Sequence, residues 1–129
     1  MKFTNKGFTL VEIMVVVFIV ALLATLAIPN LLKARITANE SAAKATLKSI
    51  SNALENYYSI NSQYPPNTSA LLGDVPPYLN TDYFNGAHQG YNFSAALSAY
   101  TYSIVAQPVS TSTGASSFSM TTQGILTSN

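Results

Sequence analysis

The stretch "KGFTLVEIMVVVFIVALL", residues 6–23, is apolar enough to cross a lipid bilayer, yet it carries the carboxylate of Glu12. The apolar run continues to Ile28, and its polar residues after Gly7 are Thr9, Glu12 and Thr25. A helix of this length spans roughly 30 Å, which is the thickness of the hydrocarbon core of a bilayer. The stretch therefore predicts a membrane-spanning helix with a charge that needs an explanation.

The residues on either side of this apolar run help to decide which kind of membrane segment it is. Lys2 and Lys6 precede it, so the positive-inside rule predicts that the N-terminus stays in the cytoplasm and the rest is translocated. A secretory signal peptide has an apolar region of about 7–15 residues and a small-x-small cleavage site. The nearest such site, Thr25-Leu26-Ala27, fits poorly. An uncleaved anchor accounts for the length and the lysines but gives no role to Glu12.

The position of Glu12 points to a partner outside the helix. A carboxylate at the centre of a membrane helix costs about 2.5–3.5 kcal/mol, and less near the end. Its place near the helix start gains about 0.3–1 kcal/mol from the helix dipole, which offsets only part of that cost. We therefore expect the carboxylate to meet a cation that another chain supplies.

The segment "KGFTLVE", residues 6–12, resembles the class III signal of type IV pilins and of the pseudopilins of type II secretion systems. In that family a prepilin peptidase cleaves after the glycine, here Gly7, and the new N-terminal residue, here Phe8, is N-methylated. The family's glutamate, here Glu12, pairs with the N-terminal amine of a neighbouring subunit during filament assembly. Pro29 falls where the family's long helix bends, and the resemblance covers about the first 65 residues.

The chemistry of the segment agrees with this resemblance. Cleavage after Gly7 removes both lysines and creates an ammonium group on Phe8. Phe8 and Glu12 are one helical turn apart, so pairing within one chain is geometrically allowed, while staggered chains bring Glu12 to the amine of a neighbour. Because desolvation offsets much of the attraction of a buried ion pair, we expect this pair to set the register of the subunits.

Beyond the membrane segment the helical pattern continues to about Ile60. Pro29 is expected to bend or locally unwind the helix, and Pro65-Pro66 forbids its continuation. Apolar residues at helical spacing predict one buried stripe: Ala43, Leu47, Ile50, Leu54 and Tyr57. The polar residues expected on the solvated side are Lys44, Lys48, Ser51 and Glu55.

The C-terminal half alternates in the manner of strands. After a loop over residues 63–90, strands are expected over 91–97, 100–106 and 116–126, the last with a bend at Gln123-Gly124. The predicted fold is α+β and pilin-like: a long N-terminal helix, kinked near Pro29, packs against a small antiparallel sheet. The expected organisation is a leader over residues 1–7, a transmembrane or filament-core helix over 8–28 and a globular domain over 29–129. Within that domain we expect the amphipathic helix half over 29–62 and the sheet over 91–129.

Composition excludes several kinds of site. The formal net charge is +1 and there is no basic patch, so nucleic-acid binding is not expected. No cysteine is present, so the disulfide of many type IV pilins is absent. No carboxylate follows Asp82, so the calcium site of many major pseudopilins is not expected in its usual form, and we predict no metal or cofactor. His88, the one histidine, lies in a glycine-rich loop without an acidic neighbour, so no catalytic residue is identified and the chain is not expected to be an enzyme.

The resemblance implies a structural subunit of a type IV pilus-like filament. The alternatives are a pseudopilin of a type II secretion system and an uncleaved, membrane-anchored binding module. The partners implied are identical subunits in a helical homopolymer, prepilin peptidase, an assembly ATPase and an inner-membrane platform protein. The precursor would span the inner membrane once, and the assembled chain would lie in an extracellular pilus or a periplasmic pseudopilus.

Overall fold

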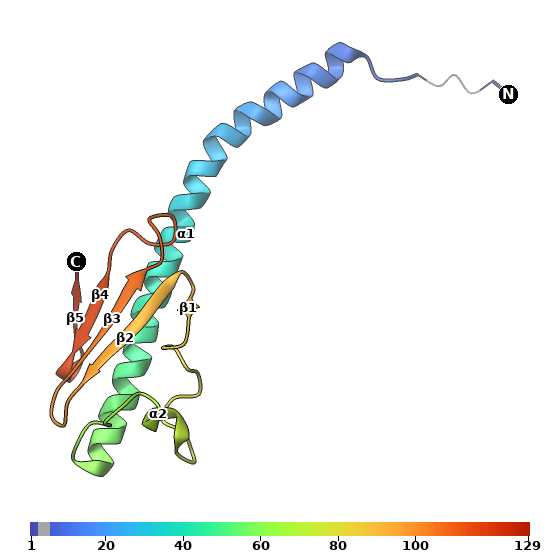
Figure 1. Ribbon diagram of the computed structural model, residues 1–129. Helices are drawn as coiled ribbons and strands as arrows, with labels where there is room; N and C mark the ends of the chain where they lie inside the picture. Colours follow the sequence, from blue (N-terminus) through green and yellow to red (C-terminus); the bar gives the residue numbers. More distant parts are fainter. Residues whose placement is uncertain (3–5) are drawn as a thin grey trace. The chain divides into compact units, whose positions relative to one another are not determined.

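A computed structural model describes residues 1–2 and 6–129 of the chain (Figure 1). The chain divides into two compact units, Met1–Ala34 and Arg35–Asn129. The predicted leader, residues 1–7, lies partly outside the described residues.

Helix α1, Leu10–Asn61, is 52 residues long and contributes to both units. In the first unit, none of its residues from Leu10 to Ala34 is buried, although most of them are large and apolar. The helix continues through Pro29, so it is not unwound there, and the bend at this residue stays a prediction. Because Pro29 has no N–H, the carbonyl of Thr25 lacks its usual helical donor.

The second unit holds an antiparallel meander in which consecutive strands are neighbours. The strands are β1 (Ala87–His88), β2 (Tyr91–Leu97), β3 (Tyr102–Pro108), β4 (Phe118–Thr121) and β5 (Ile125–Ser128). A four-residue helix, α2 (Ala70–Gly73), lies in the loop before β1, and the 3₁₀ turn η1 (Thr122–Gly124) joins β4 to β5. Figure 1 shows this sheet along one side of α1. The α+β pilin-like class is confirmed.

The core of the second unit lies between α1 and the sheet. The predicted helical stripe forms the α1 side of it: Ala43, Leu47, Ile50 and Leu54 are buried, and Tyr57 packs at the margin. The sheet side consists of alternate residues on β2, β3 and β4: Tyr91, Phe93, Tyr102, Ile104, Ala106, Phe118 and Met120. Along these three strands the inward residues recur at every second position, as the geometry of an extended chain requires.

Three differences from the predicted strands have local causes. The strand expected over 100–106 begins at Tyr102, and Tyr100 is exposed. The strand expected over 116–126 is two strands, β4 and β5, because Gln123 (φ 70°) and Gly124 (φ 72°) adopt left-handed conformations that reverse the chain. The elements α2 and β1 lie inside the stretch expected to be a loop. They were not predicted, because each is too short to show a periodicity.

Ser51 was expected on the solvated side of α1, and this prediction is wrong. Its side chain is buried, and its hydroxyl lies 2.7 Å from the hydroxyl of Tyr102 in a hydrogen bond. The neighbouring Tyr64 donates a hydrogen bond of 3.1 Å to Glu55. Burial, followed by this hydrogen bond to Glu55, raises the pKa of Tyr64 well above its ordinary value, so this phenol stays a donor.

A loop between β3 and β4 is fastened to α1 by two hydrogen bonds. The Nδ2 of Asn39 donates to the carbonyl of Thr113 at 2.9 Å, and the N–H of Ala115 donates to Oε1 of Glu40 at 3.1 Å. The hydroxyl of Tyr91 donates to the carbonyl of Ser116 at 2.9 Å. These contacts hold the Ser- and Thr-rich loop against the folded unit.

Candidate assembly site at the helix start

The start of α1 is a capping box built from Thr9 and Glu12. The N–H and the hydroxyl of Thr9 both donate to Oε2 of Glu12, at 2.8 and 2.9 Å. In return the N–H of Glu12 donates to Oγ1 of Thr9 at 3.3 Å. This reciprocal pattern satisfies two backbone donors that a helix start otherwise leaves unpaired. Glu12 is thus held by its own chain at the end of an apolar helix.

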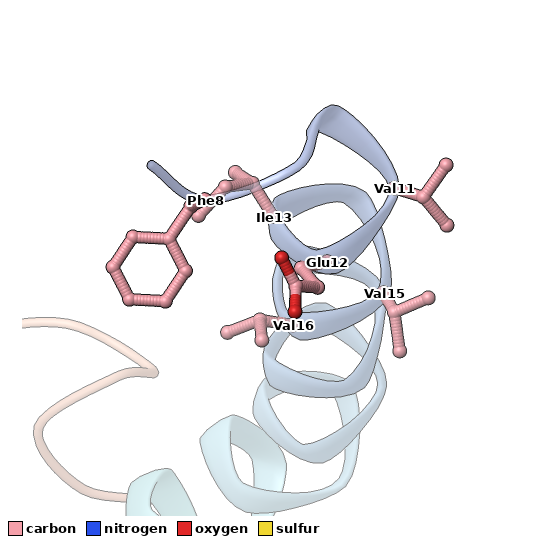
Figure 2. A pocket seen from close by; sticks show the side chains of 6 residues that line it. All are labelled: Phe8, Val11, Glu12, Ile13, Val15 and Val16. Atoms are coloured by element: carbon pink, nitrogen blue, oxygen red, sulfur yellow. The ribbon is translucent and has the colours of Figure 1, made fainter. Parts of the chain in front are cut away.

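Apolar side chains surround this carboxylate. A groove of about 410 Å³ is lined by Glu12 and by Phe8, Val11, Ile13, Val15 and Val16. Figure 2 shows the carboxylate near the centre of this set, with the Phe8 ring to one side and Val11 and Val15 on the other. The start of α1 therefore presents one carboxylate among apolar side chains.

The capping box leaves room for a further interaction. All the hydrogen bonds that Glu12 accepts in the described part of the chain go to Oε2, and Oε1 is left available. Cleavage after Gly7 would turn the amide nitrogen of Phe8 into an ammonium group. One residue of backbone separates this nitrogen from that of Thr9, so it would come within roughly 4–6 Å of the carboxylate of its own chain. The carboxylate can thus meet its own amine or that of a neighbour.

The residues predicted for cleavage and N-methylation, Gly7 and Phe8, are exposed. Lys6 to Thr9 precede the helix, and Gly7 is exposed with no atom near the position of a Cβ. Phe8 is 85% exposed, and Pro29 lies further along α1, outside this group. The structure therefore brings Phe8 and Glu12 together and keeps Gly7 accessible, while cleavage and methylation themselves stay predictions.

Thr9 is the residue of this site that was not predicted. In the sequence it counts only as a polar interruption of the apolar run. The pattern Thr-x-x-Glu before an apolar segment is, however, a known signal for a capping box. That signal was sufficient to identify Thr9 as the residue that fixes the carboxylate of Glu12.

His88, which lies in β1 and not in a loop as expected, and the nearby Asp82 both have local structural partners. Nε2 of His88 lies 3.0 Å from the carbonyl oxygen of Asp82 and its ring packs edge-on to Tyr83. Oδ1 of Asp82 accepts a hydrogen bond from the N–H of Phe84 at 3.0 Å, which is ordinary turn geometry. Among the described residues, no group of His, Asp or Glu side chains is arranged to hold a metal ion.

By length and composition, α1 is the one helix among the described residues that could span a membrane. None of its apolar window is buried, unlike the core helix of a soluble protein. An apolar N-terminal helix of this kind fits a membrane-anchored precursor.

Comparison with known proteins agrees with this geometry. Residues 2–28 match the prokaryotic N-terminal methylation motif. The chain is 36% identical over 92 residues to the type IV major pilin protein PilA of Myxococcus xanthus, covering 71% of this chain and 38% of the relative. It is 43% identical over 67 residues to the type IV wide pilus major component PilA4 of Thermus thermophilus, covering 52% of this chain and 51% of the relative.

A second group of relatives comes from secretion systems. The type II secretion system core protein G of Vibrio cholerae is 38% identical over 87 residues, covering 67% of this chain and 60% of the relative. The chain thus spans between 38% and 60% of the length of these relatives. Type IV pilins and type II secretion core protein G are thus among the relatives of this chain, which carries the methylation motif at its N-terminus.

Proposed function

We propose that this chain is a structural subunit of a type IV pilus-like filament. It is inserted into the inner membrane as a precursor, cleaved after Gly7 by prepilin peptidase and N-methylated on Phe8. An assembly ATPase and an inner-membrane platform protein then bring it into a helical homopolymer, and its N-terminal helix packs among identical helices. The resulting pilus lies outside the cell.

The observation that carries this proposal is that the apolar half of α1 buries none of its residues. No residue between Leu10 and Ala34 is buried by its own chain. Burying a large aliphatic side chain contributes about 1.5–3 kcal/mol, so a row of them in water is strongly unfavourable. Lipid covers such a surface before assembly, and the same surface of other copies covers it afterwards.

Glu12 supplies direction to this otherwise non-directional packing. Thr9 orients its carboxylate and leaves Oε1 available, which supports a pairing with the ammonium group of a neighbouring Phe8. A charge pair in an apolar surrounding is sensitive to a shift of one helical turn, because a shifted neighbour leaves both charges unpaired. The pair therefore selects one stagger between neighbouring subunits.

The test compares Glu12→Ala with Glu12→Gln in cells that express the precursor. Both variants should be cleaved and methylated, which mass spectrometry of the N-terminus detects as a chain starting at methylated Phe8. Both should fail to form filaments, because neither side chain carries a charge. Normal filament yield from Glu12→Gln would show that the charge is not required, since glutamine still reaches the N–H of Thr9.

The relatives named core protein G favour a second candidate, a pseudopilin of a type II secretion system. Both candidates share the N-terminal chemistry, so deletion of the gene separates them. Loss of long surface fibres with secretion intact supports the pilus. Loss of secreted enzymes with fibres intact supports the pseudopilin. A native chain that still starts at Met1 would instead support the uncleaved, membrane-anchored binding module.

A further inference from the structure

The second unit exposes apolar residues beside an acidic group at the C-terminal end of α1. A groove of about 540 Å³, here called the proline groove, is lined by residues that include Ile60, Asp74, Val75, Pro76, Pro77 and Tyr78. Val75 is 98% exposed and Ile60 is 70% exposed. Because both line the same groove, they form one apolar surface with the carboxylate of Asp74 at its side.

The walls of this groove are held in place by packing. The centre of the Tyr78 ring lies 5.3 Å from the centre of the Tyr57 ring on α1. The N–H of Leu79 donates to the carbonyl of Leu71 at 3.0 Å, and both side chains are buried. Pro76 and Pro77 have fixed backbone φ angles, so the loop loses little further freedom when something docks on it.

A second exposed surface, here called the lysine flank, lies between α1 and β5. Leu126 pairs with the buried Met120, so it is on the helix side of the sheet, yet it is 43% exposed at the sheet edge. The Nζ of Lys44 lies 4.7 Å from the centre of the Phe118 ring. The Nζ of Lys48 lies beside Gly124, 3.5 Å from where a Cβ would stand, at the entry to β5. The lysine flank therefore combines an apolar side chain with two cations.

The charges of the two surfaces are complementary. Glu40 and Glu55 lie on the same side of α1 as the lysines, but their carboxylates accept hydrogen bonds from Ala115 and Tyr64. Lys48 and Asp74 are exposed, and neither has a hydrogen bond or ion pair within the described part of the chain. Each surface thus offers an apolar centre with one unengaged charge of opposite sign.

We infer that the proline groove of one copy of this chain binds the lysine flank of the next copy, with Asp74 facing Lys48 and Val75 facing Leu126. The two surfaces lie at separate places on the second unit, one at the loop around α2 and one at β5 (Figure 1). Contact between two different patches repeats head to tail and forms an open polymer, whereas contact between identical patches closes into a dimer. This contact rests on the proposed function and adds a second interface to the packing of the N-terminal helices.

Disulfide trapping tests the contact, because the chain has no cysteine of its own. A Val75→Cys/Leu126→Cys double variant should give a ladder of dimers, trimers and larger multimers when filaments are oxidised and run without reductant. The single variants should stay monomeric. Val109→Cys/Leu126→Cys is the matched control, since Val109 is also exposed but lies outside the proline groove, and it should give no ladder.

The possible results separate the contact from the proposed function. Filaments of the double variant without a ladder overturn the contact and leave the filament subunit standing. Dimers from a single variant, or an equal ladder from the Val109 control, also overturn it, because either result means a different or unspecific approach. If the wild-type chain forms no filament at all, the proposed function fails and the contact fails with it.

A charge exchange provides a second test that does not depend on disulfide geometry. Asp74→Lys should lower the yield of sheared filaments severalfold, and Lys48→Asp should do the same, because each places like charges across the contact. The double variant restores the opposite signs and should recover most of the yield. A double variant that is as poor as the worse single variant would overturn the pairing of these two residues.

Discussion

The two units of this chain share one helix but differ in what buries the apolar residues of that helix. From Arg35 onward α1 buries Leu47, Ile50 and Leu54 against its own sheet. Before Ala34 the same helix buries none of its residues. One half is therefore folded by contacts within the chain, and the other half needs lipid or other copies to cover it.

The sequence pattern of the two halves explains this difference. In the second unit, apolar residues recur on one stripe of the helix, and charged residues such as Lys44 and Lys48 separate them. Between Leu10 and Ile28 the helix is apolar on all sides except for Glu12 and Thr25. A helix that is apolar all round has to be buried all round, which a sheet on one side cannot provide. The comparison teaches that a filament subunit can divide its apolar surface between folding and assembly.

The largest expected effect on the free energy of unfolding comes from truncating a leucine, and it should differ between the two units. Leu54→Ala removes a wholly buried side chain and should lower the free energy of unfolding by about 2–5 kcal/mol. Leu22→Ala removes an exposed side chain and should leave unfolding of the second unit unchanged. Urea unfolding of the detergent-solubilised chain, followed by tyrosine circular dichroism, measures both. Equal destabilisation by the two variants would remove the distinction between the units.

Two glycines give the next comparison. A Cβ at Gly114 would overlap the hydroxyl of Tyr91, which is fixed by its hydrogen bond to Ser116. Gly114→Ala should therefore lower the free energy of unfolding by about 1–3 kcal/mol. Gly7→Ala should have no effect on unfolding, because no atom lies within 4 Å of the added carbon. The same unfolding measurement checks the pair, and an unchanged midpoint for Gly114→Ala would contradict the close packing of this loop.

Much of this arrangement could be predicted from residue patterns because those patterns are long. The helical stripe from Ala43 to Leu54 and the alternation in β2 each repeat often enough to identify a buried face. The hairpin at Gln123-Gly124 was predicted only as a bend, because a left-handed glutamine has no strong sequence signal. Ser51 was misplaced because a serine is polar by type, and its burial depends on Tyr102, a residue far away in the sequence.

The buried hydroxyl pair gives a smaller effect, confined to the second unit. Ser51→Ala removes the hydrogen bond to Tyr102 and should lower the free energy of unfolding by about 1 kcal/mol. Ser41→Ala is the control, because its hydroxyl is exposed and donates to the carbonyl of Thr37 one turn earlier. A thermal unfolding series of Ser51→Ala, Tyr102→Phe and the double variant should show non-additive losses. Additive losses would mean that the two hydroxyl groups act separately.

The smallest expected effect on unfolding comes from Thr9, which also tests what Glu12 does. Thr9→Val removes the hydroxyl from the capping box but keeps the N–H that donates to Oε2 of Glu12. The unfolding midpoint should not change, since none of the described residues of the first unit is buried. Amide hydrogen exchange should become faster over residues 10–13. Thr9→Ser keeps the hydroxyl and serves as the control.

The filament yield of Thr9→Val separates capping from pairing between chains. If Glu12 is needed as a charge for a neighbouring amine, Thr9→Val should lower the yield only partly, because the carboxylate remains and is merely less well oriented. If Glu12 is needed only to cap its own helix, Thr9→Val and Glu12→Ala should lower the yield to a similar extent, since both disrupt the same box. A yield near wild type for Thr9→Val, with none for Glu12→Ala, would therefore assign the carboxylate to the contact between subunits and leave the cap a minor role.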